Sequence, residues 1–301
     1  QRRHKLADKV TAALEGSLSD ELRAAMAGWL AGKDDAAASR QYGDQMKSLL
    51  SAADPVQASI LADADLFTKK SVWIFGGDGW AYDIGFGGLD HVIASGEDIN
   101  ILVMDTEVYS NTGGQASKAT PLGAIAKFAS AGKVTGKKDL ARMAMTYGYV
   151  YVASVAMGAD KNQTLKAFLE AEAHKGPSIV IAYAPCINQG IRKGMGKSME
   201  EAKLAVETGY WPLYRFNPAL KAEGKNPLVI DSKAPAGDFQ GFLSGEVRYA
   251  ALEKLAPENS KRYRATMEAA YKQRYKELEF LAGMPVFDAA GAAGTGGGDS
   301  E

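Results

Sequence analysis

The stretch that decides the fold is SVWIFGGDGWAYDIGFGGLDHVIASGEDINILVMDTEVYSNTGGQ, residues 71–115. It contains two apolar, strand-like runs, 71–76 and 99–105, and each run ends in a turn of glycines or polar residues. The first turn, Gly77-Asp78-Gly79, lets the backbone approach a ligand closely and offers one carboxylate. Open α/β sheets bind ligands just beyond the carboxyl ends of their strands. We therefore expect the turns after both runs to form one binding site.

Strand-like and helix-like patterns alternate through the central part of the chain. Further runs that predict strands lie at 150–156, 178–183 and 211–216. Stretches with a helical spacing of apolar residues lie at 82–95, 138–147, 161–174 and 199–207. Such alternation is typical of a mainly parallel sheet with helices on both faces. The sequence therefore predicts a doubly wound α/β fold.

The segments that flank this alternation have a different character. Residues 1–65 are alanine-rich and helical in pattern, which predicts a helical lead-in segment before an α/β domain at 66–223. Prolines and glycines indicate an extended connector at 224–237, and helices are predicted at 244–255 and 260–281. We assign residues 224–283 to this connector and its helices. Residues 284–301 form a low-complexity tail, expected to be disordered or to link onward.

The composition excludes several classes of protein. At 301 residues, with 46% apolar and 24% charged residues, the chain has the values of an ordinary globular protein. A net charge of -1, with lysines scattered among acidic residues, argues against nucleic-acid binding. No apolar run approaches the about 18 residues of a membrane span and no signal peptide is recognisable, so we expect no membrane partner and a cytoplasmic location. The chain starts at Gln1 in a helical pattern, and we expect it to be part of a longer protein.

The spacing of Asp78 and Thr106 predicts a metal site. They are 28 positions apart, which fits one strand-helix-strand unit and places both residues at the same edge of the sheet. Magnesium prefers octahedral oxygen ligands and commonly combines one carboxylate with phosphate oxygens. Asp78, a hydroxyl or carbonyl of Thr106 and the Val108 carbonyl would be a sufficient share from the protein. Because a diphosphate would supply the remainder, we expect a site for a diphosphate and magnesium.

Two other phosphate-binding motifs are incomplete in this chain. A dinucleotide fingerprint GxGxxG that starts at Gly77 needs a third glycine at position 82, which is Tyr82. A Walker loop that ends in Gly196-Lys197-Ser198 needs a glycine at position 191, which is Ile191. Neither motif therefore explains the glycines of the chain.

Two features near the expected site are unusual. Gly85, Gly87 and Gly88 lie inside the helix predicted at 82–95, although glycine is a poor helix former. We expect these glycines to permit tight packing or to lie near the ligand. The loop at 111–136 spans about 25 residues without an obvious strand, and loops of this length are commonly functional. We expect this loop to act as a lid or a subunit contact.

Several strings in the chain resemble a known family. Gly77-Asp78-Gly79, followed about 30 residues later by Asn111, resembles the thiamine diphosphate motif. The string EVYSNTGGQASKATPLG resembles the pyruvate:ferredoxin (flavodoxin) oxidoreductases in particular. The likeness extends from about residue 71 to residue 281 and includes APCINQG around Cys186 and FLSGEVRYAALEKLAPE near the end. The resemblance implies a thiamine diphosphate-binding fold.

The resemblance also implies roles for individual residues. Asp78, Thr106 and the Val108 carbonyl are the implied magnesium ligands. Asn111 is implied to face cofactor and substrate, where an amide can hydrogen-bond developing charge. Further contacts with thiamine diphosphate are implied for Gly77, Gly79, Trp80, Glu107, Tyr109 and Ser110.

Cys186 is the only cysteine, so no disulfide can form within the chain. By residue type alone it is interpreted as a small buried apolar residue. The resemblance instead implies that Cys186 is the fourth ligand to the 4Fe-4S cluster nearest thiamine. Such a cluster needs four thiolates, so the other three would precede Gln1.

An activity and a set of partners also follow from the resemblance. Pyruvate would lose carbon dioxide on thiamine diphosphate, electrons would pass through 4Fe-4S clusters to ferredoxin or flavodoxin, and coenzyme A would collect the acetyl group. The activating glutamate would come from a pyrimidine-binding domain outside these residues, so this chain alone is predicted to be inactive. That domain, a ferredoxin-like domain and a second copy in a homodimer are the implied partners. The alternatives are a different 2-oxoacid substrate and a non-catalytic assembly module.

Overall fold

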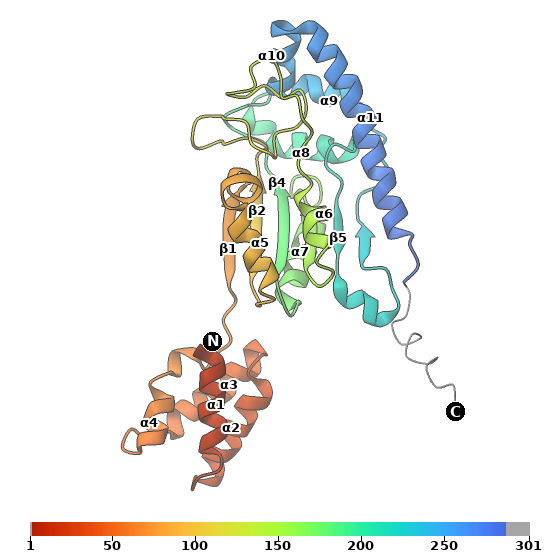
Figure 1. Ribbon diagram of the computed structural model, residues 1–301. Helices are drawn as coiled ribbons and strands as arrows, with labels where there is room; N and C mark the ends of the chain where they lie inside the picture. Colours follow the sequence, from red (N-terminus) through yellow and green to blue (C-terminus); the bar gives the residue numbers. More distant parts are fainter. Residues whose placement is uncertain (1, 287–301) are drawn as a thin grey trace, which may run out of the picture. The chain divides into compact units, whose positions relative to one another are not determined.

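The computed structural model describes residues 2–286, which divide into two compact units between Ser71 and Val72 (Figure 1). The division lies a few residues beyond the end of the lead-in segment expected at 1–65. The low-complexity tail expected at 284–301 lies outside the described residues from position 287 onward.

The first unit is helical, as the sequence predicts. Polar residues cap its helices: the side chains of Ser19, Asp35 and Asp54 each accept a hydrogen bond from a backbone N–H in the first turn. Trp29 is fully buried in the core of this unit, and its Nε1 donates to the Phe67 carbonyl at 2.8 Å. The helices are α1 (Arg2–Ala13), α2 (Asp20–Gly32), α3 (Ala36–Leu49) and α4 (Pro55–Leu61).

The second unit is built on a six-stranded sheet of order β1-β2-β4-β3-β5-β6. The first four strands in this order pair in parallel, and β5 and β6 are antiparallel. The predicted mainly parallel α/β fold is confirmed. The strands are β1 (Trp73–Gly77), β2 (Asn100–Asp105), β3 (Tyr151–Val155), β4 (Ser178–Tyr183), β5 (Tyr214–Phe216) and β6 (Leu228–Ile230).

The antiparallel edge of the sheet differs from the prediction. The strand predicted at 211–216 is limited to β5, and β6 lies within the segment expected to be a connector. Strands of three residues are too short to show a clear alternation of polar and apolar residues. Pro227 directly precedes β6, a position that is tolerated at the start of an edge strand.

Helices cover both faces of the sheet because successive side chains of a strand point to opposite faces. Ile101 and Val103 of β2 belong to a large core that also includes residues of α5, α6, α8 and the C-terminal helices. Leu102 packs in a second core with Ala167 and Ala171 of α7. The helices of this unit are α5 (Phe86–Ala94), α6 (Leu140–Met145), α7 (Lys161–Ala173), α8 (Ser198–Glu207), α9 (Phe239–Gly245), α10 (Val247–Leu255) and α11 (Pro257–Ala282).

Two predicted helices have a different shape in the structure. The helix predicted at 82–95 begins earlier as a π-helix (Gly79–Ile84) that continues into α5, and π-helical turns are frequent at functional sites. The helix predicted at 244–255 is divided into α9 and α10, because Glu246 has an extended backbone conformation. The last helix, α11, is the long one that runs along one side of the second unit in Figure 1.

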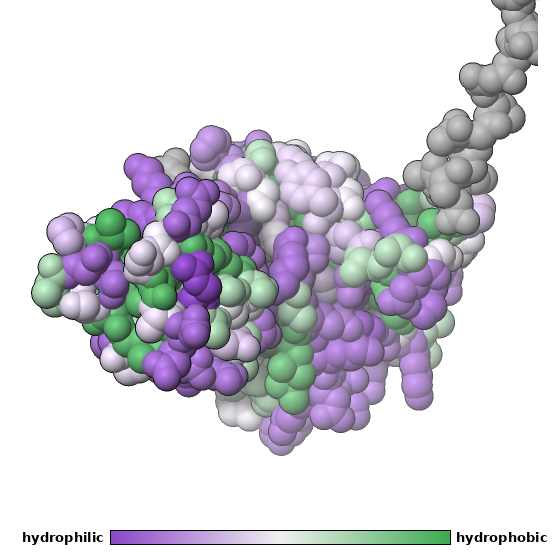
Figure 2. All heavy atoms as spheres, turned by 90° about the horizontal axis from the view of Figure 1, so that it is seen from below, coloured by the Kyte–Doolittle hydropathy of each residue, from purple (hydrophilic) through white to green (hydrophobic). Residues whose placement is uncertain are grey.

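The surface is mixed in character. On the face drawn in Figure 2, hydrophobic residues are interspersed with hydrophilic ones. Across residues 2–286, no helix combines the length and the apolar character that crossing a membrane requires.

Candidate functional site

The two turns singled out in the sequence lie side by side at one edge of the sheet. β1 and β2 are adjacent and parallel, with Gly77 paired with Met104. Asp78 directly follows β1, and Thr106 directly follows β2. The structure therefore brings together the residues that the spacing of 28 positions predicts to be close.

Three oxygen atoms converge at this edge. Thr106 Oγ1 lies 2.8 Å from Asp78 Oδ1 and 3.0 Å from the Val108 carbonyl oxygen. The backbone N–H of Thr106 also donates to Asp78 Oδ1 at 3.2 Å. Neighbouring ligands of an octahedral magnesium ion with bonds of about 2.1 Å lie about 3 Å apart, so the spacing of these oxygens fits a shared metal ion.

The Asp78 carboxylate is buried, with 1% of the residue exposed. Burial is the main cause that raises its pKa to about 6, and the negative charge of Asp105 adds to the effect. Hydrogen bonds from Thr106 and Ser117 stabilise the charged carboxylate and therefore lower its pKa. A cation bound at this carboxylate would favour its charged form in the same way.

Ser117 is a residue of this site that the sequence analysis did not single out. Its Oγ donates to Asp78 Oδ2 at 2.9 Å, so both carboxylate oxygens of Asp78 have a hydroxyl partner. Ser117 lies in the string that carries the family resemblance, but no local pattern connects it with Asp78, 39 positions away.

The glycines of the site make room for aromatic rings. A Cβ atom on Gly79 would lie 2.3 Å from the ring of Tyr109, whose hydroxyl donates to the Gly79 carbonyl at 3.2 Å. The ring of Trp80 leaves no room for a Cβ on Gly76 or on Gly85, where the nearest ring atom would be 2.2 Å away. The expectation of tight packing is therefore confirmed for Gly85.

Gly87 and Gly88 differ from Gly85. A Cβ atom at either position would meet no atom within 4 Å. Tight packing is therefore excluded for these two glycines, which lie on the open side of α5, and a position near the ligand stays a prediction for them. Gly77 is also open, because a Cβ atom there would meet only the Met104 carbonyl oxygen, 4.0 Å away.

The residues after Val108 form a tight loop with Asn111 exposed in it. The Tyr109 N–H donates to the Gln115 carbonyl at 3.0 Å, and the Gly114 N–H donates to the Tyr109 carbonyl at 2.8 Å. Gly113 and Gly114 both have positive φ values, 128° and 81°, which suit glycine. The amide of Asn111 is therefore free of buried packing and accessible from outside the chain.

Cys186 lies next to this loop. Its Sγ is 3.4 Å from Ser110 Oγ, and its side chain packs with Val108 and Ala126. The residue is 2% exposed in this chain, as its residue type predicts. The structure thus places the single cysteine beside the predicted thiamine loop, 76 positions away in sequence.

The long loop at 111–136 is tied to this edge by backbone contacts. Lys127 donates its N–H to the Gly114 carbonyl at 2.8 Å and accepts from the Ala116 N–H at 2.9 Å. Phe128 follows with a φ of 68° and an exposure of 93%. The loop is thus anchored beside the Asn111 loop, and its role as a lid or subunit contact stays a prediction.

Glu107 does not face the edge with its side chain. Its carboxylate accepts hydrogen bonds from Lys137 at 3.0 Å, Tyr210 at 2.5 Å and Arg248 at 3.1 Å, in the interior of the unit. The Glu107 carboxylate is therefore engaged inside the unit, and the contact of residue 107 with the cofactor stays a prediction. The partners lie 30 to 141 positions away, so no local sequence signal could have identified them.

Lys137 joins Glu107 to a second buried carboxylate. Its Nζ lies 2.7 Å from Asp105 Oδ2, which also accepts from the Tyr82 hydroxyl at 2.7 Å. Burial lowers the pKa of Lys137, but the carboxylates of Asp105 and Glu107 outweigh burial and leave the pKa raised. Lys137 is therefore a charged ammonium between two acids.

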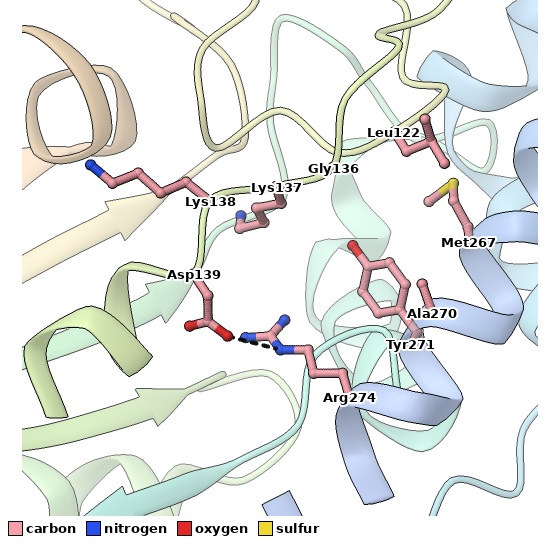
Figure 3. Close-up of a pocket in the computed structure, with 9 residues that line it drawn as sticks. All are labelled: Leu122, Gly136, Lys137, Lys138, Asp139, Met267, Ala270, Tyr271 and Arg274. Atoms are coloured by element: carbon pink, nitrogen blue, oxygen red, sulfur yellow. Dashed lines mark ion pairs between the residues drawn. The ribbon is translucent and has the colours of Figure 1, made fainter. Parts of the chain in front are cut away.

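A cavity of about 190 Å³ lies between residues 136–139 and α11 (Figure 3). Arg274 and Asp139, which both line this cavity, form an ion pair with a nitrogen-oxygen distance of 3.5 Å, and the Lys138 side chain points away from them. None of the predicted site residues lines this cavity. The lining residues are Leu122, Gly136, Lys137, Lys138, Asp139, Met267, Ala270, Tyr271 and Arg274.

Comparison with known families places this geometry in context. The thiamine pyrophosphate enzyme, C-terminal TPP binding domain, matches residues 49–182, which include Asp78, Thr106 and Val108. The pyruvate-ferredoxin oxidoreductase insertion domain matches residues 2–55, within the first unit. Pyruvate:ferredoxin oxidoreductase of Moorella thermoacetica is 57% identical over 290 residues, 94% of this chain and 25% of its own. This chain belongs to the pyruvate:ferredoxin (flavodoxin) oxidoreductase family.

Other relatives support the assignment to this family. Pyruvate-flavodoxin oxidoreductase of Klebsiella pneumoniae is 56% identical over 284 residues, 93% of this chain and 24% of its own. The mitochondrial pyruvate dehydrogenase (NADP+) of Euglena gracilis is 45% identical over 298 residues, 98% of this chain and 16% of its own. The chain thus spans about a quarter of the length of the first two relatives. It carries the thiamine diphosphate-binding domain, and the family resemblance drawn from its motifs is confirmed.

Proposed function

We propose that this chain is the diphosphate-binding part of an oxidoreductase that decarboxylates pyruvate. In this proposal electrons pass through 4Fe-4S clusters to ferredoxin or flavodoxin, and coenzyme A receives the acetyl group. The observation that carries it is the convergence of oxygens from Asp78, Thr106 and Val108 within the thiamine diphosphate-binding domain. The names of the relatives support pyruvate as the substrate.

In this proposal, different residues at the carboxyl ends of β1 and β2 contact the magnesium ion and the diphosphate. Asp78, Thr106 and the Val108 carbonyl would hold magnesium, and the diphosphate would lie against Gly77, Gly79 and Trp80. When bound, thiamine diphosphate supplies the electron sink for loss of carbon dioxide from a 2-oxoacid. The exposed amide of Asn111 would donate a hydrogen bond to charge that develops at the reacting centre, and Tyr109 and Ser110 would complete the contacts.

Cys186 is proposed as one ligand of a 4Fe-4S cluster. Its contact with Ser110 supports a cluster close to the thiamine loop. The chain has one cysteine, so the other three thiolates would come from elsewhere in the assembly. In the complete enzyme, Cys186→Ala is expected to remove about four iron atoms per chain. Ser110→Ala should keep the iron, and full iron content in Cys186→Ala would contradict the assignment.

The acceptor, assembly and location are also proposals. Relatives are named for ferredoxin, flavodoxin and NADP+, so the acceptor varies among proteins that share this domain. We propose ferredoxin or flavodoxin for this protein, with pyrimidine-binding and ferredoxin-like domains of the same enzyme as partners. A homodimer and a cytoplasmic location complete the proposal.

The decisive experiment is a titration of the complete enzyme with thiamine diphosphate in the presence of magnesium. Asp78→Ala is expected to abolish binding that depends on magnesium, because the carboxylate is the one charged protein ligand proposed for the metal. Asp90→Ala, an exposed position on α5, is the matched control and should bind normally. Normal affinity in Asp78→Ala would refute the site.

The same preparation separates the alternatives. Absence of thiamine diphosphate binding in the unaltered complete enzyme would favour a non-catalytic assembly module. Turnover of pyruvate and 2-oxoglutarate side by side would separate a pyruvate enzyme from one that acts on another 2-oxoacid. We expect pyruvate to be the better substrate by kcat/KM.

A further inference from the structure

Glu107, the residue between the proposed magnesium ligands Thr106 and Val108, has an unfavourable backbone conformation. Its φ of 64° is in the left-handed region that residues with a Cβ atom avoid. Phe128 is the one other non-glycine residue among residues 2–286 with a positive φ. Such a conformation persists only where surrounding contacts enforce it, and it is found frequently at functional sites.

Every polar atom of Glu107 is engaged. Its backbone N–H donates to Asp105 Oδ1 at 3.1 Å, and its carbonyl accepts from Thr120 Oγ1 at 2.6 Å. Its carboxylate is held by the side chains of Lys137, Tyr210 and Arg248. With 1% of Glu107 exposed, these contacts are the ones that define its conformation.

The two cationic side chains that hold Glu107 are Lys137 and Arg248. They come from segments outside the metal edge, which consists of the proposed magnesium ligands Asp78, Thr106 and Val108. Lys137 precedes α6, and Arg248 is in the first turn of α10 with its side chain 1% exposed. Arg248 NH1 lies 3.1 Å from Glu107 Oε2 and 3.5 Å from the Thr106 carbonyl, and its Nε lies 3.2 Å from Glu246 Oε2. Arg248 therefore contacts both the Glu107 carboxylate and the backbone of Thr106, a proposed magnesium ligand.

We propose that Arg248 and Lys137 are positioning residues for the metal edge. By anchoring the Glu107 carboxylate they hold residue 107 in the left-handed conformation, which keeps the Thr106 hydroxyl and the Val108 carbonyl on the same side, 3.0 Å apart. The inference rests on the proposed function. It gives helix α10 a part in cofactor binding although Arg248 stays buried behind the metal edge.

The experiment compares Glu107→Ala with Glu107→Gly in the complete enzyme. Both variants remove the carboxylate, but only glycine adopts a positive φ without a steric cost. The measured quantity is the magnesium concentration that gives half-maximal thiamine diphosphate binding, followed by calorimetry. We expect Glu107→Ala to need about ten times more magnesium than the unaltered enzyme, and Glu107→Gly to need clearly less than Glu107→Ala.

A second pair of variants tests the cations directly. Arg248→Lys keeps the charge but loses the planar fork that reaches Glu107, Glu246 and the Thr106 carbonyl together. It should raise the magnesium requirement while kcat at saturating magnesium stays near that of the parent. Arg262→Lys on the exposed side of α11 is the matched control and should leave the magnesium requirement unchanged.

The outcomes separate this inference from the proposed function. If Asp78→Ala abolishes binding but Glu107→Ala and Glu107→Gly have the same magnesium requirement, the inference is overturned and the proposed function stands. If Asp78→Ala binds normally, the proposed function itself fails. Should Glu107→Ala not fold, the decision passes to Arg248→Lys, for which an unchanged magnesium requirement overturns the inference.

Discussion

Burial raises the pKa of several carboxyl groups in the second unit, among them Asp78 and Glu246. It raises the pKa of Asp78 to about 6 and that of Glu246 to about 7. At Glu246 the charges of Glu107 and Glu201 raise the pKa further, and Arg248 opposes them. Glu246 is not one of the proposed metal ligands, so unfolding in the absence of magnesium can report on its titration.

The raised pKa of Glu246 predicts a pH dependence of stability. Between about pH 5 and about pH 7 the folded chain holds a proton that the unfolded chain has released, so the free energy of unfolding falls as pH rises through this window. Glu246→Gln should flatten this slope and leave the chain about 2 kcal/mol more stable than the parent at pH 8. Urea unfolding of the second unit at pH 5, 6, 7 and 8 measures the effect.

Part of the slope should remain in Glu246→Gln, because the pKa values of Asp78, Asp105 and Glu201 are raised as well. Glu223→Gln is a suitable control, since the Glu223 side chain is 55% exposed and pairs with exposed Lys225. Parallel pH profiles for the parent and Glu246→Gln would show that the Glu246 carboxyl is charged throughout the window.

At the scale of elements, the passage from β1 through the π-helix to α5 depends on where its glycines lie. Trp80 fills the space on one side of Gly76 and Gly85, whereas Gly87 and Gly88 have open space beside them. Glycine is therefore required for close packing at Gly76 and Gly85, but no packing contact requires it at Gly87 or Gly88. The geometry explains the first case, and nothing in the structure explains the second.

Alanine substitutions should separate these glycines. Gly85→Ala places a Cβ 2.2 Å from the Trp80 ring and should destabilise the second unit by about 1–3 kcal/mol through overpacking. Gly87→Ala adds a methyl group in open space within α5 and should stabilise by about 0.5–1 kcal/mol, since alanine has the higher helix propensity. Thermal unfolding monitored by circular dichroism gives both values, and effects of the same sign would contradict the packing argument.

At the scale of the whole molecule, the chain consists of two compact units with separate cores. The core of the first unit contains Trp29, and the cores of the second contain residues from β1 to α11. The first unit corresponds to the match with the insertion domain of the family, and the site lies entirely in the second unit. Each unit therefore has the interior it needs for its own cooperative folding.

Limited digestion with trypsin should divide the chain at Lys70, which is exposed beside the boundary between the units. We expect fragments that end at Lys70 and begin at Ser71 to accumulate before cuts inside α1 to α3, because helices within a packed core resist cleavage. Mass spectrometry of the early products measures this. Early cuts within those helices would show that the first unit lacks an independent core.

Local patterns in the sequence predicted most of the fold and the position of the candidate site. The alternation of apolar runs predicted the parallel sheet, and the spacing of Asp78 and Thr106 predicted their meeting, because strand ends in a parallel sheet share one edge. The three-residue strand β6 leaves no periodic signal and was missed, whereas β5, which is equally short, lies within a predicted strand.

Only the tertiary structure decided how that edge is supported. Ser117 reaches Asp78 across 39 positions, and Arg248 reaches Glu107 across 141. The Glu107 carboxylate points inward, and its backbone has a left-handed conformation that glutamate does not favour by itself. Residue types and local periodicity specify the helices and strands and where they end. The pairing of buried charges depends instead on which distant segments the folded chain brings together, so the residues next to a charge in the sequence do not identify its partner.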